Sequence, residues 1–341
     1  MKVVKGMKEE LKNQVERTHW LPSSIKLDMS QKIDDYGIEI GYPEWYKNDD
    51  AVTRYYDGLS IGSDYFQNIL NALKKKSKKL EILRQVVEKS TWVDYPTTYN
   101  AYYSPDTNTI CECHKNKISI FHILLLTNQI RIFLLNINFS VLLATQLQDP
   151  YFTPSLPDAI IYGGRGFTIG HELGHGCDKT GIELDKDGNK IPWESHNALE
   201  GYDQRANCFV DQYSNYILHI SNDTKEDIKL NGTNTNGEDI SDSVGVQIAY
   251  SAYKKAEKER IQSKLPGFED ISNDKLFFLS LANYWCATTK SGYDEYMEFD
   301  EHSPFKYRVI GALSNMAAFS EVFNCPQNSS MNRQHKCSLW D

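Results

Sequence analysis

The pattern of apolar and polar positions divides the chain into a helical part and a longer mixed part. Through residues 1–94, apolar side chains recur every three or four positions among many charges, which predicts amphipathic helices. Val52 to Lys89 is the clearest case and holds no proline. Thr98 to Ile110 alternates and is rich in Tyr and Thr, so it predicts a strand. Asp158 to Thr180 predicts a glycine-marked turn followed by a helix, and Asn231 to Asn236 predicts a polar loop before another helix.

Composition narrows the class of protein. The chain has 341 residues, 40% of them hydrophobic and 24% charged, which is typical of a soluble globular protein with one large core or two modest ones. A formal net charge of -9 argues against nucleic acid as a partner. The basic cluster at residues 74–79 is interpreted as a solvated helix face, with a localisation or nucleic-acid signal as the alternative.

The first chemical motif is His171-Glu172-Leu173-Gly174-His175. On a helix, two imidazoles four residues apart share one face, so both can bind the same metal ion. Glu172 would point slightly off that face, where it can take a proton from a water bound at the metal. This arrangement is typical of a zinc peptidase with a third ligand elsewhere in the chain. The alternative is a pair of surface histidines on a helix.

Two carboxylates about sixty residues later offer that third ligand. Glu238 and Asp242 are again four residues apart, so on a helix they share a face. One carboxylate can complete a two-histidine zinc site and leave a position open for water. The other can accept the spare ring N–H of a ligand histidine and fix its tautomer. A capped, solvated helix start remains the alternative.

Further motifs occur in order along nearly the whole chain. They are Ile40–Trp45, Asn100–Tyr103, Tyr162–Gly164, Cys208–Tyr213, Tyr284–Cys286, His302–Pro304, Tyr307–Gly311 and Cys337–Trp340. With the two metal motifs, they resemble the neprilysin and endothelin-converting-enzyme family of zinc metallopeptidases. The resemblance implies a mainly α fold with a small β-sheet, and a zincin (thermolysin-like) catalytic domain. It divides the chain into residues 1–94, the end of a helical N-terminal domain, and residues 98–341, the catalytic domain.

The resemblance also implies a role for each site residue. His171, His175 and Glu238 would bind one Zn²⁺ ion, and Glu172 would be the general base. Asp242 would orient a ligand histidine, and His302 would stabilise the oxyanion. The remaining residues would bind the peptide substrate: Asn100 and Ala101 along its backbone, Arg308 at a carbonyl or carboxylate, and Phe167 and Trp285 around an apolar side chain. For Phe167 and Trp285, ordinary core packing is the alternative.

Two residues depart from the family pattern. Gly174 stands where the family usually has Thr, and a helical glycine costs roughly 1 kcal/mol relative to Ala. Asp239 replaces the usual Asn and is expected to add a negative charge near the metal. Neither change removes a ligand or a catalytic group, so neither predicts an inactive enzyme.

Cysteines and sequons indicate an extracellular setting. Seven cysteines cannot all pair within the chain. The resemblance pairs Cys208 with Cys337, and pairs Cys286 and Cys325 with cysteines near the start of a full-length ectodomain. Sequons at Asn222, Asn231 and Asn328 fit a glycosylated protein. The resemblance further implies that this is the C-terminal part of a larger protein, secreted or held at the outer face of the plasma membrane by an N-terminal anchor that the chain lacks.

Residues 111–143 interrupt the family pattern. They are rich in Ile, Leu, Phe, Asn and Lys. A membrane span is one interpretation, although polar residues such as Asn128, Gln129 and Arg131 break the apolar run. A second is a loop that exposes an apolar patch near the cleft. We favour a third, a translated intron, because AT-rich codons give this residue mix. A segment retained here would split the strand hairpin beside the zinc helix and impair activity.

The sequence therefore predicts a zinc endopeptidase that hydrolyses short peptides. The alternative is an inactive or truncated ectodomain fragment that acts by binding. The intact ligand set favours the enzyme, whereas the missing N-terminal region, the unpaired cysteines and the interrupted segment favour the fragment.

Overall fold

The computed structural model describes residues 2–38, 40–41, 44–78, 101–104, 109–112, 142–143, 153–191, 198–220, 227–259 and 264–340. The helices are α1 Lys2–Arg17, α2 Ser23–Asp34, η1 Glu44–Lys47, α3 Asp49–Tyr56, α4 Tyr65–Lys78, α6 Asp158–Ile161, η4 Tyr162–Gly166, α7 Phe167–His175, α8 Ala198–Tyr213, α9 Gly232–Glu259, α10 Asn273–Tyr284, α11 Tyr293–Met297, α12 Phe305–Ser314 and α13 Ala317–Val322. The strands are β1 Gly37–Ile38, β2 Ile40–Gly41, β3 Ala101–Ser104, β4 Thr109–Glu112, β5 Leu142–Leu143, β6 Ile217–Ile220 and β7 Asp227–Lys229. The predicted fold class, mainly α with a small sheet, is confirmed.

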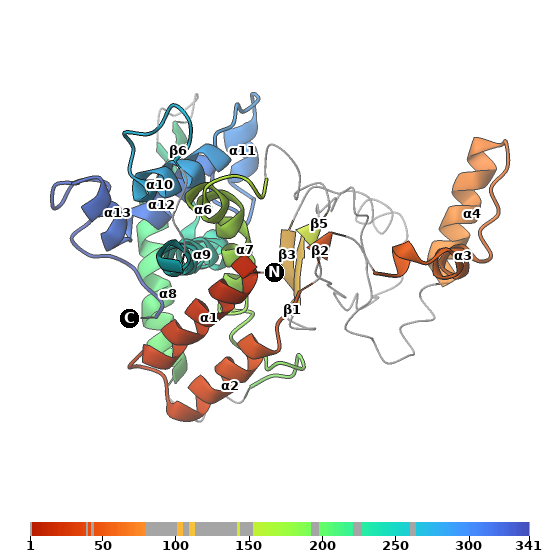
Figure 1. The fold of residues 1–341 in the computed structure, drawn as a ribbon, viewed down its shortest axis with the longest axis horizontal. Coiled ribbons are helices and arrows are strands. Elements are labelled where there is room, and N and C mark those ends of the chain that lie inside the picture. The colour runs from red at the N-terminus through yellow and green to blue at the C-terminus, as the bar shows by residue number, and fades with distance from the viewer. Residues whose placement is uncertain are drawn as a thin grey trace.

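Helix α9 runs through the middle of the helical body (Figure 1). It packs against α1, α7, α8 and α12. Its middle, residues 239–249, is buried on nearly all sides, with Ile240, Val244, Val246 and Ile248 each at most 2% exposed. A helix covered all round needs small and apolar residues on every face, which explains the weak amphipathic pattern of this segment.

Helices α1 and α2 belong to the same core as α7 and α9. Val4, Met7, Leu11 and Val15 of α1 recur every three or four residues, as the sequence pattern predicts, and are buried. From α2, the buried Lys32 ammonium group donates to the carbonyl oxygens of Gly176, Gly181 and Leu184. A segment that starts the chain therefore holds the loop that follows α7. The domain division at residue 94 stays a prediction.

The small sheet lies beside α7. Strands β1, β4 and β3 form it in that order, with β3 and β4 antiparallel from Ala101↔Glu112 to Ser104↔Thr109. The described residues of Thr98 to Ile110 are in strands, as predicted, but they belong to two antiparallel strands, so the prediction of a single strand is wrong. The first two and last two residues of the expected interruption lie in β4 and β5, and β5 pairs with β2. Its remaining residues, 113–141, lie outside the described part of the chain.

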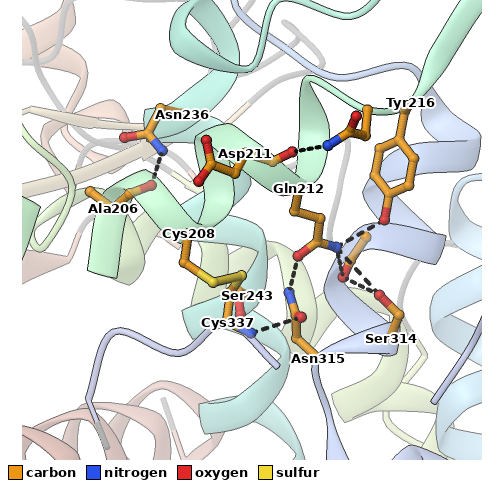
Figure 2. The surroundings of a disulfide bond; sticks show 12 residues. Ala206, Cys208, Asp211, Gln212, Tyr216, Asn236, Ser243, Ser314, Asn315 and Cys337 are labelled. Carbon is orange, nitrogen blue, oxygen red and sulfur yellow. Dashed lines mark hydrogen bonds between the residues drawn. A yellow bond between two sulfur atoms is a disulfide. The ribbon is translucent and has the colours of Figure 1, made fainter. Parts of the chain in front are cut away.

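A disulfide joins α8 to the C-terminal tail (Figure 2). Cys208 and Cys337 are bonded, as the resemblance implied, whereas Cys286 and Cys325 are free thiols in this chain. Beside the disulfide, Asn315 donates to the Gln212 side-chain oxygen at 2.9 Å and accepts from the Cys337 backbone N–H at 3.0 Å. These contacts fix α12 and the tail against α8.

The helix predicted from Val52 to Lys89 is wrong as a single element. The described residues form α3 and α4 with a break at residues 57–64. Gly58 has a φ of +74°, a conformation that ends a helix. Asp64 then accepts the Gln67 backbone N–H at 2.8 Å and caps α4. In Figure 1 the two helices lie apart from the helical body.

Two predicted irregular segments are also helical. The stretch before the zinc motif is not a turn but α6 followed by a π-helical turn over Tyr162–Gly166. Residues 232–236 belong to α9 rather than to a loop, because Asn231 accepts the Asn234 backbone N–H at 3.2 Å and tertiary partners hold the polar side chains. One example is Asn236, which donates to the Ala206 carbonyl at 3.0 Å (Figure 2).

Two expectations about the surface have partial answers. Lys74 and Lys76 in α4 are exposed, which confirms a solvated helix face for these two positions. Among the helices of the described ranges, none is long and apolar enough to cross a bilayer.

Candidate active site

Helices α7 and α9 cross with their backbones in contact. A Cβ atom on Gly170 would lie 2.5 Å from the Gly245 carbonyl oxygen, and one on Gly174 would lie 2.9 Å from the Ser241 backbone. Both distances are too short for a Cβ atom unless the helices shift, so in this chain the two glycines permit the close approach. The close crossing brings the two histidines of α7 to the two carboxylates of α9. Gly174, a weak point by helix propensity, is therefore part of what assembles the site.

The three predicted metal ligands face one another. His171 Nε2 lies 3.1 Å from His175 Nε2 and 3.1 Å from Glu238 Oε2, and His175 Nε2 lies 3.6 Å from the same oxygen. Tetrahedral zinc with bonds of roughly 2.0–2.1 Å places neighbouring ligand atoms about 3.3 Å apart. Glu238 Oε2 is buried and makes no hydrogen bond with a described residue. The donor set and its spacing therefore fit one zinc ion.

The ring nitrogens that face away from this centre have carboxylate partners. His171 Nδ1 lies 2.8 Å from Asp242 Oδ1, and His175 Nδ1 lies 2.8 Å from Asp178 Oδ2. A carboxylate in this position fixes the tautomer and orientation of a ligand histidine. Sequence reasoning identified Asp242 but missed Asp178. The only signal in the sequence was that Asp178 follows His175 by three residues. In the structure Asp178 also accepts the backbone N–H groups of Thr180 and Gly181.

Glu172 is buried beside the two histidines. One carboxylate oxygen of Glu172 and one ring nitrogen of each histidine lie within 4.8 Å of one another. The other described residues offer no hydrogen-bond partner to Glu172 Oε2. Burial raises the pKa of the Glu172 carboxyl. A carboxylate whose pKa moves towards neutrality is better matched to proton transfer near pH 7.

Charge is distributed unevenly over the ligands. Burial disfavours charge on Glu238, but the neighbouring His175 and His302 outweigh it and hold the pKa of Glu238 well below its usual value. Burial likewise disfavours a charged His175, but the Glu238 and Asp178 carboxylates raise its pKa well above the usual value. The Glu238 carboxyl is therefore held in its anionic form, which suits a candidate ligand of a cation.

His302 lies next to Glu238, in the segment before α12. Its Nε2 is 3.5 Å from Glu238 Oε2, and its Nδ1 is 2.7 Å from Asp300 Oδ1. Asp300 also accepts the His302 backbone N–H at 2.8 Å. Sequence reasoning missed Asp300, although a carboxylate two residues before a candidate catalytic histidine was visible. Asp300 leaves Nε2 as the atom that faces the centre.

The Arg308 guanidinium group is buried in the site. Its Nε and Nη2 donate to the two Asp242 oxygens at 2.8 and 2.6 Å, and the Trp285 ring lies 4.2 Å away. Trp285 also meets Phe167 edge to face, with ring centroids 6.0 Å apart. The structure thus brings three of the predicted substrate residues together next to His171. Their roles towards a substrate stay predictions.

The structure places two further predicted residues. The Asp239 carboxyl accepts from Ser303 at 2.6 Å and Thr235 at 2.7 Å, and burial raises its pKa well above the usual value, so the expected added charge near the metal stays a prediction. Ala101 begins β3, an edge strand that packs against α7. Asn100 lies outside the described residues.

A family model supports the same assignment. The model for peptidase family M13 matches residues 133–339, more than half of the chain. Its match includes every candidate metal ligand and begins inside the expected interruption. Peptidase chemistry is thus a property of the family to which the matched residues belong.

Relatives of known name agree. The chain is 32% identical to neprilysin-11 of Caenorhabditis elegans over 345 residues, covering 100% of this chain and 37% of that protein. It is 34% identical to an endothelin-converting enzyme homologue of Locusta migratoria, covering 99% of this chain and 42% of that protein. Human neprilysin is 34% identical over 326 residues, which cover 94% of this chain and 39% of that protein. The chain spans about two fifths of the length of these relatives.

Solved structures show the same fold. The Mycobacterium tuberculosis zinc metalloprotease Zmp1 in complex with an inhibitor matches with a TM-score of 0.77 and 25% identity, over 99% of this chain and 46% of that one. PepO of Lactobacillus rhamnosus matches with a TM-score of 0.73 and 23% identity, over 97% of this chain and 45% of that one. Family model, relatives and fold agree, and the chain belongs to peptidase family M13.

Proposed function

We propose that this chain carries the catalytic centre of a zinc endopeptidase that hydrolyses short peptides. The observation that supports it most is the mutual spacing of His171, His175 and Glu238, which fits the ligand-to-ligand separation of one tetrahedral zinc ion. When bound there, zinc would polarise the peptide carbonyl and lower the pKa of a water molecule.

The chain's own residues carry the proton transfers in this proposal. Glu172 takes a proton from the attacking water and later delivers it to the leaving amine. His302, held at Nδ1 by Asp300, would donate a hydrogen bond from Nε2 to the oxygen of the tetrahedral intermediate in its doubly protonated, imidazolium form. Asp242 and Asp178 hold the two ligand histidines in position.

Substrate binding would use the sheet edge and the apolar wall. β3 is an edge strand in the order β1-β4-β3, so a peptide can add beside it with Asn100 and Ala101 contacting its backbone. Phe167 and Trp285 would enclose an apolar side chain of the substrate. Arg308 would contact a substrate carbonyl or carboxylate from its position over Trp285.

The Cys208–Cys337 disulfide supports an oxidising compartment, outside the cell, for this activity. An N-terminal membrane anchor beyond this chain, or secretion, would place it there.

The decisive experiment compares the chain with Glu172→Gln on an internally quenched peptide. We expect kcat/KM to fall by about 10²–10⁴-fold, because the general base is lost while the ligands remain. Zinc content, measured by elemental analysis, should be unchanged. Glu200→Gln, an exposed glutamate of α8, is the matched control and should retain full activity.

Two results would contradict the proposal. Equal turnover by Glu172→Gln would remove the general base from the mechanism. One bound zinc per chain with no turnover in any variant would support the alternative, a fragment that acts by binding.

A further inference from the structure

A second group of metal-binding side chains lies next to the first. Glu238, Glu301 and His302 each offer one ligand atom, and these atoms lie within 4.8 Å of one another. Glu238 belongs to α9, whereas Glu301 and His302 belong to the segment before α12. All three side chains are partly exposed, so ions in solution can reach them.

The segment that carries Glu301 and His302 is fastened to α9 on both sides. Before it, Asn234 donates to the Asp300 carbonyl oxygen at 2.6 Å. After it, Ser303 donates to Asp239 Oδ1 at 2.6 Å. Because both anchors lie within one turn of Glu238, the position of Glu301 and His302 relative to Glu238 is set by the fold.

His302 has the surroundings of a metal-binding histidine. Its Nδ1 faces Asp300 at 2.7 Å, so in the neutral ring the proton stays on Nδ1 and the lone pair is on Nε2. Nε2 in turn lies 3.5 Å from Glu238 Oε2. One imidazole nitrogen with carboxylate oxygens is a donor set that suits zinc better than calcium or magnesium.

The neighbouring space can supply the remaining ligands. A cavity of about 350 Å³ adjoins the group, and its walls include Glu238, Glu301 and Asn234. Three protein ligands plus water complete the tetrahedral coordination of zinc in an open site. Paired metal sites elsewhere hold ions about 3.5–4 Å apart, and a carboxylate that faces both ions lowers their repulsion.

We propose that Glu238, Glu301 and His302 form a second divalent-cation site, which takes zinc and shares Glu238 with the first ion. The consequence for activity rests on the proposed peptidase function. A cation on His302 Nε2 occupies the atom that would donate to the oxyanion, so filling the second site stops turnover. Free zinc thereby becomes an inhibitor of the enzyme that needs zinc for catalysis.

The binding experiment titrates metal-free chain with Zn²⁺ by isothermal calorimetry. We expect two equivalents per chain, the second weaker than the first. Glu301→Gln removes one ligand oxygen without touching the catalytic groups, and should weaken the second site by at least about tenfold while leaving the first unchanged. Glu295→Gln, an exposed glutamate of α11, is the matched control and should keep both sites. A single equivalent in the parent chain, or an unchanged second site in Glu301→Gln, would overturn the proposal.

The activity experiment adds excess zinc to chain loaded with one equivalent. We expect inhibition in the parent and in Glu295→Gln, and at least about tenfold more zinc for half-inhibition in Glu301→Gln. Unaltered turnover with two ions bound would overturn the inhibitory role. Two binding events without any turnover at one equivalent would support the second site and contradict the peptidase, whereas one event with turnover would do the opposite.

Discussion

Two regions of the molecule use their small and apolar residues in opposite ways. At the α7–α9 crossing, Gly170, Gly174 and Gly245 let two backbones touch, and everything around them is buried. In α3 and α4, apolar side chains are exposed, with Tyr65 and Phe66 79% and 70% accessible. Both regions are helical, yet among the described residues only the first packs its helices against the core. Periodicity therefore predicts a helix without predicting what covers it.

The comparison predicts that a Leu→Ala substitution lowers the free energy of unfolding much more in the first region than in the second. Leu11→Ala in α1 opens a cavity in the core shared with α7 and α9, and should lower the free energy of unfolding by about 2–5 kcal/mol. Leu73→Ala in α4 removes a side chain that is 56% exposed, and should change it by less than about 0.5 kcal/mol. Urea denaturation measures both. A Leu73→Ala cost as large as that of Leu11→Ala would mean that α4 is packed in solution.

Buried and exposed lysines should differ in their pH dependence. Burial lowers the pKa of Lys32 from 10.5 to about 8. Between pH 8 and pH 10.5, Lys32 carries a proton in the unfolded chain but not in the folded one. The free energy of unfolding therefore rises with pH over this range, by about 3 kcal/mol in total. Comparing the parent with Lys32→Met from pH 7 to pH 11 isolates this contribution. Lys76→Met, at an exposed position of α4, should give a curve parallel to the parent. A parallel curve for Lys32→Met would contradict the prediction.

The smallest predicted effect tests the crossing itself. Helix propensity alone says that Gly174→Ala stabilises α7 by roughly 1 kcal/mol. The contact with the Ser241 backbone at 2.9 Å reverses the sign, and we expect a loss of about 1–3 kcal/mol with weaker zinc binding. Gly62→Ala is the control, since a Cβ atom there meets nothing within 4 Å and should be neutral or slightly stabilising. Thermal unfolding and zinc competition measure the outcome, and a stabilised Gly174→Ala would show that α9 can move away.

Much of the candidate site could be predicted from the sequence, because its residues are spaced within single helices. His171 and His175 share a face of α7, and Glu238 and Asp242 share a face of α9, by helix geometry alone. The Cys208–Cys337 bond came from the resemblance, since spacing does not identify the partner of a cysteine. The carboxylates behind the ligands were partly missed, because Asp178 and Asp300 act from loops whose conformation no periodic pattern describes.

The errors have a common physical origin. The proline-free, amphipathic stretch from Val52 to Lys89 predicted one helix, but the structure has two. The left-handed conformation of Gly58 ends the first helix and the Asp64 cap begins the second, and both override the periodic pattern locally. The polar residues at 232–236 predicted a loop, but α9 begins there. Tertiary hydrogen bonds from Asn234 and Asn236 compensate for the weak helix propensity of these residues.

By itself the sequence determined the kind of chemistry: which side chains can bind a metal, which can move a proton, and which helical faces carry them. Only the tertiary structure decided the distances between those faces. His171 Nε2 lies 3.1 Å from Glu238 Oε2 because α7 and α9 meet at glycines on both helices. Lys32 holds the loop whose Asp178 contacts His175. Such distances depend on pairs of residues far apart in the chain, and local periodicity contains no information about them.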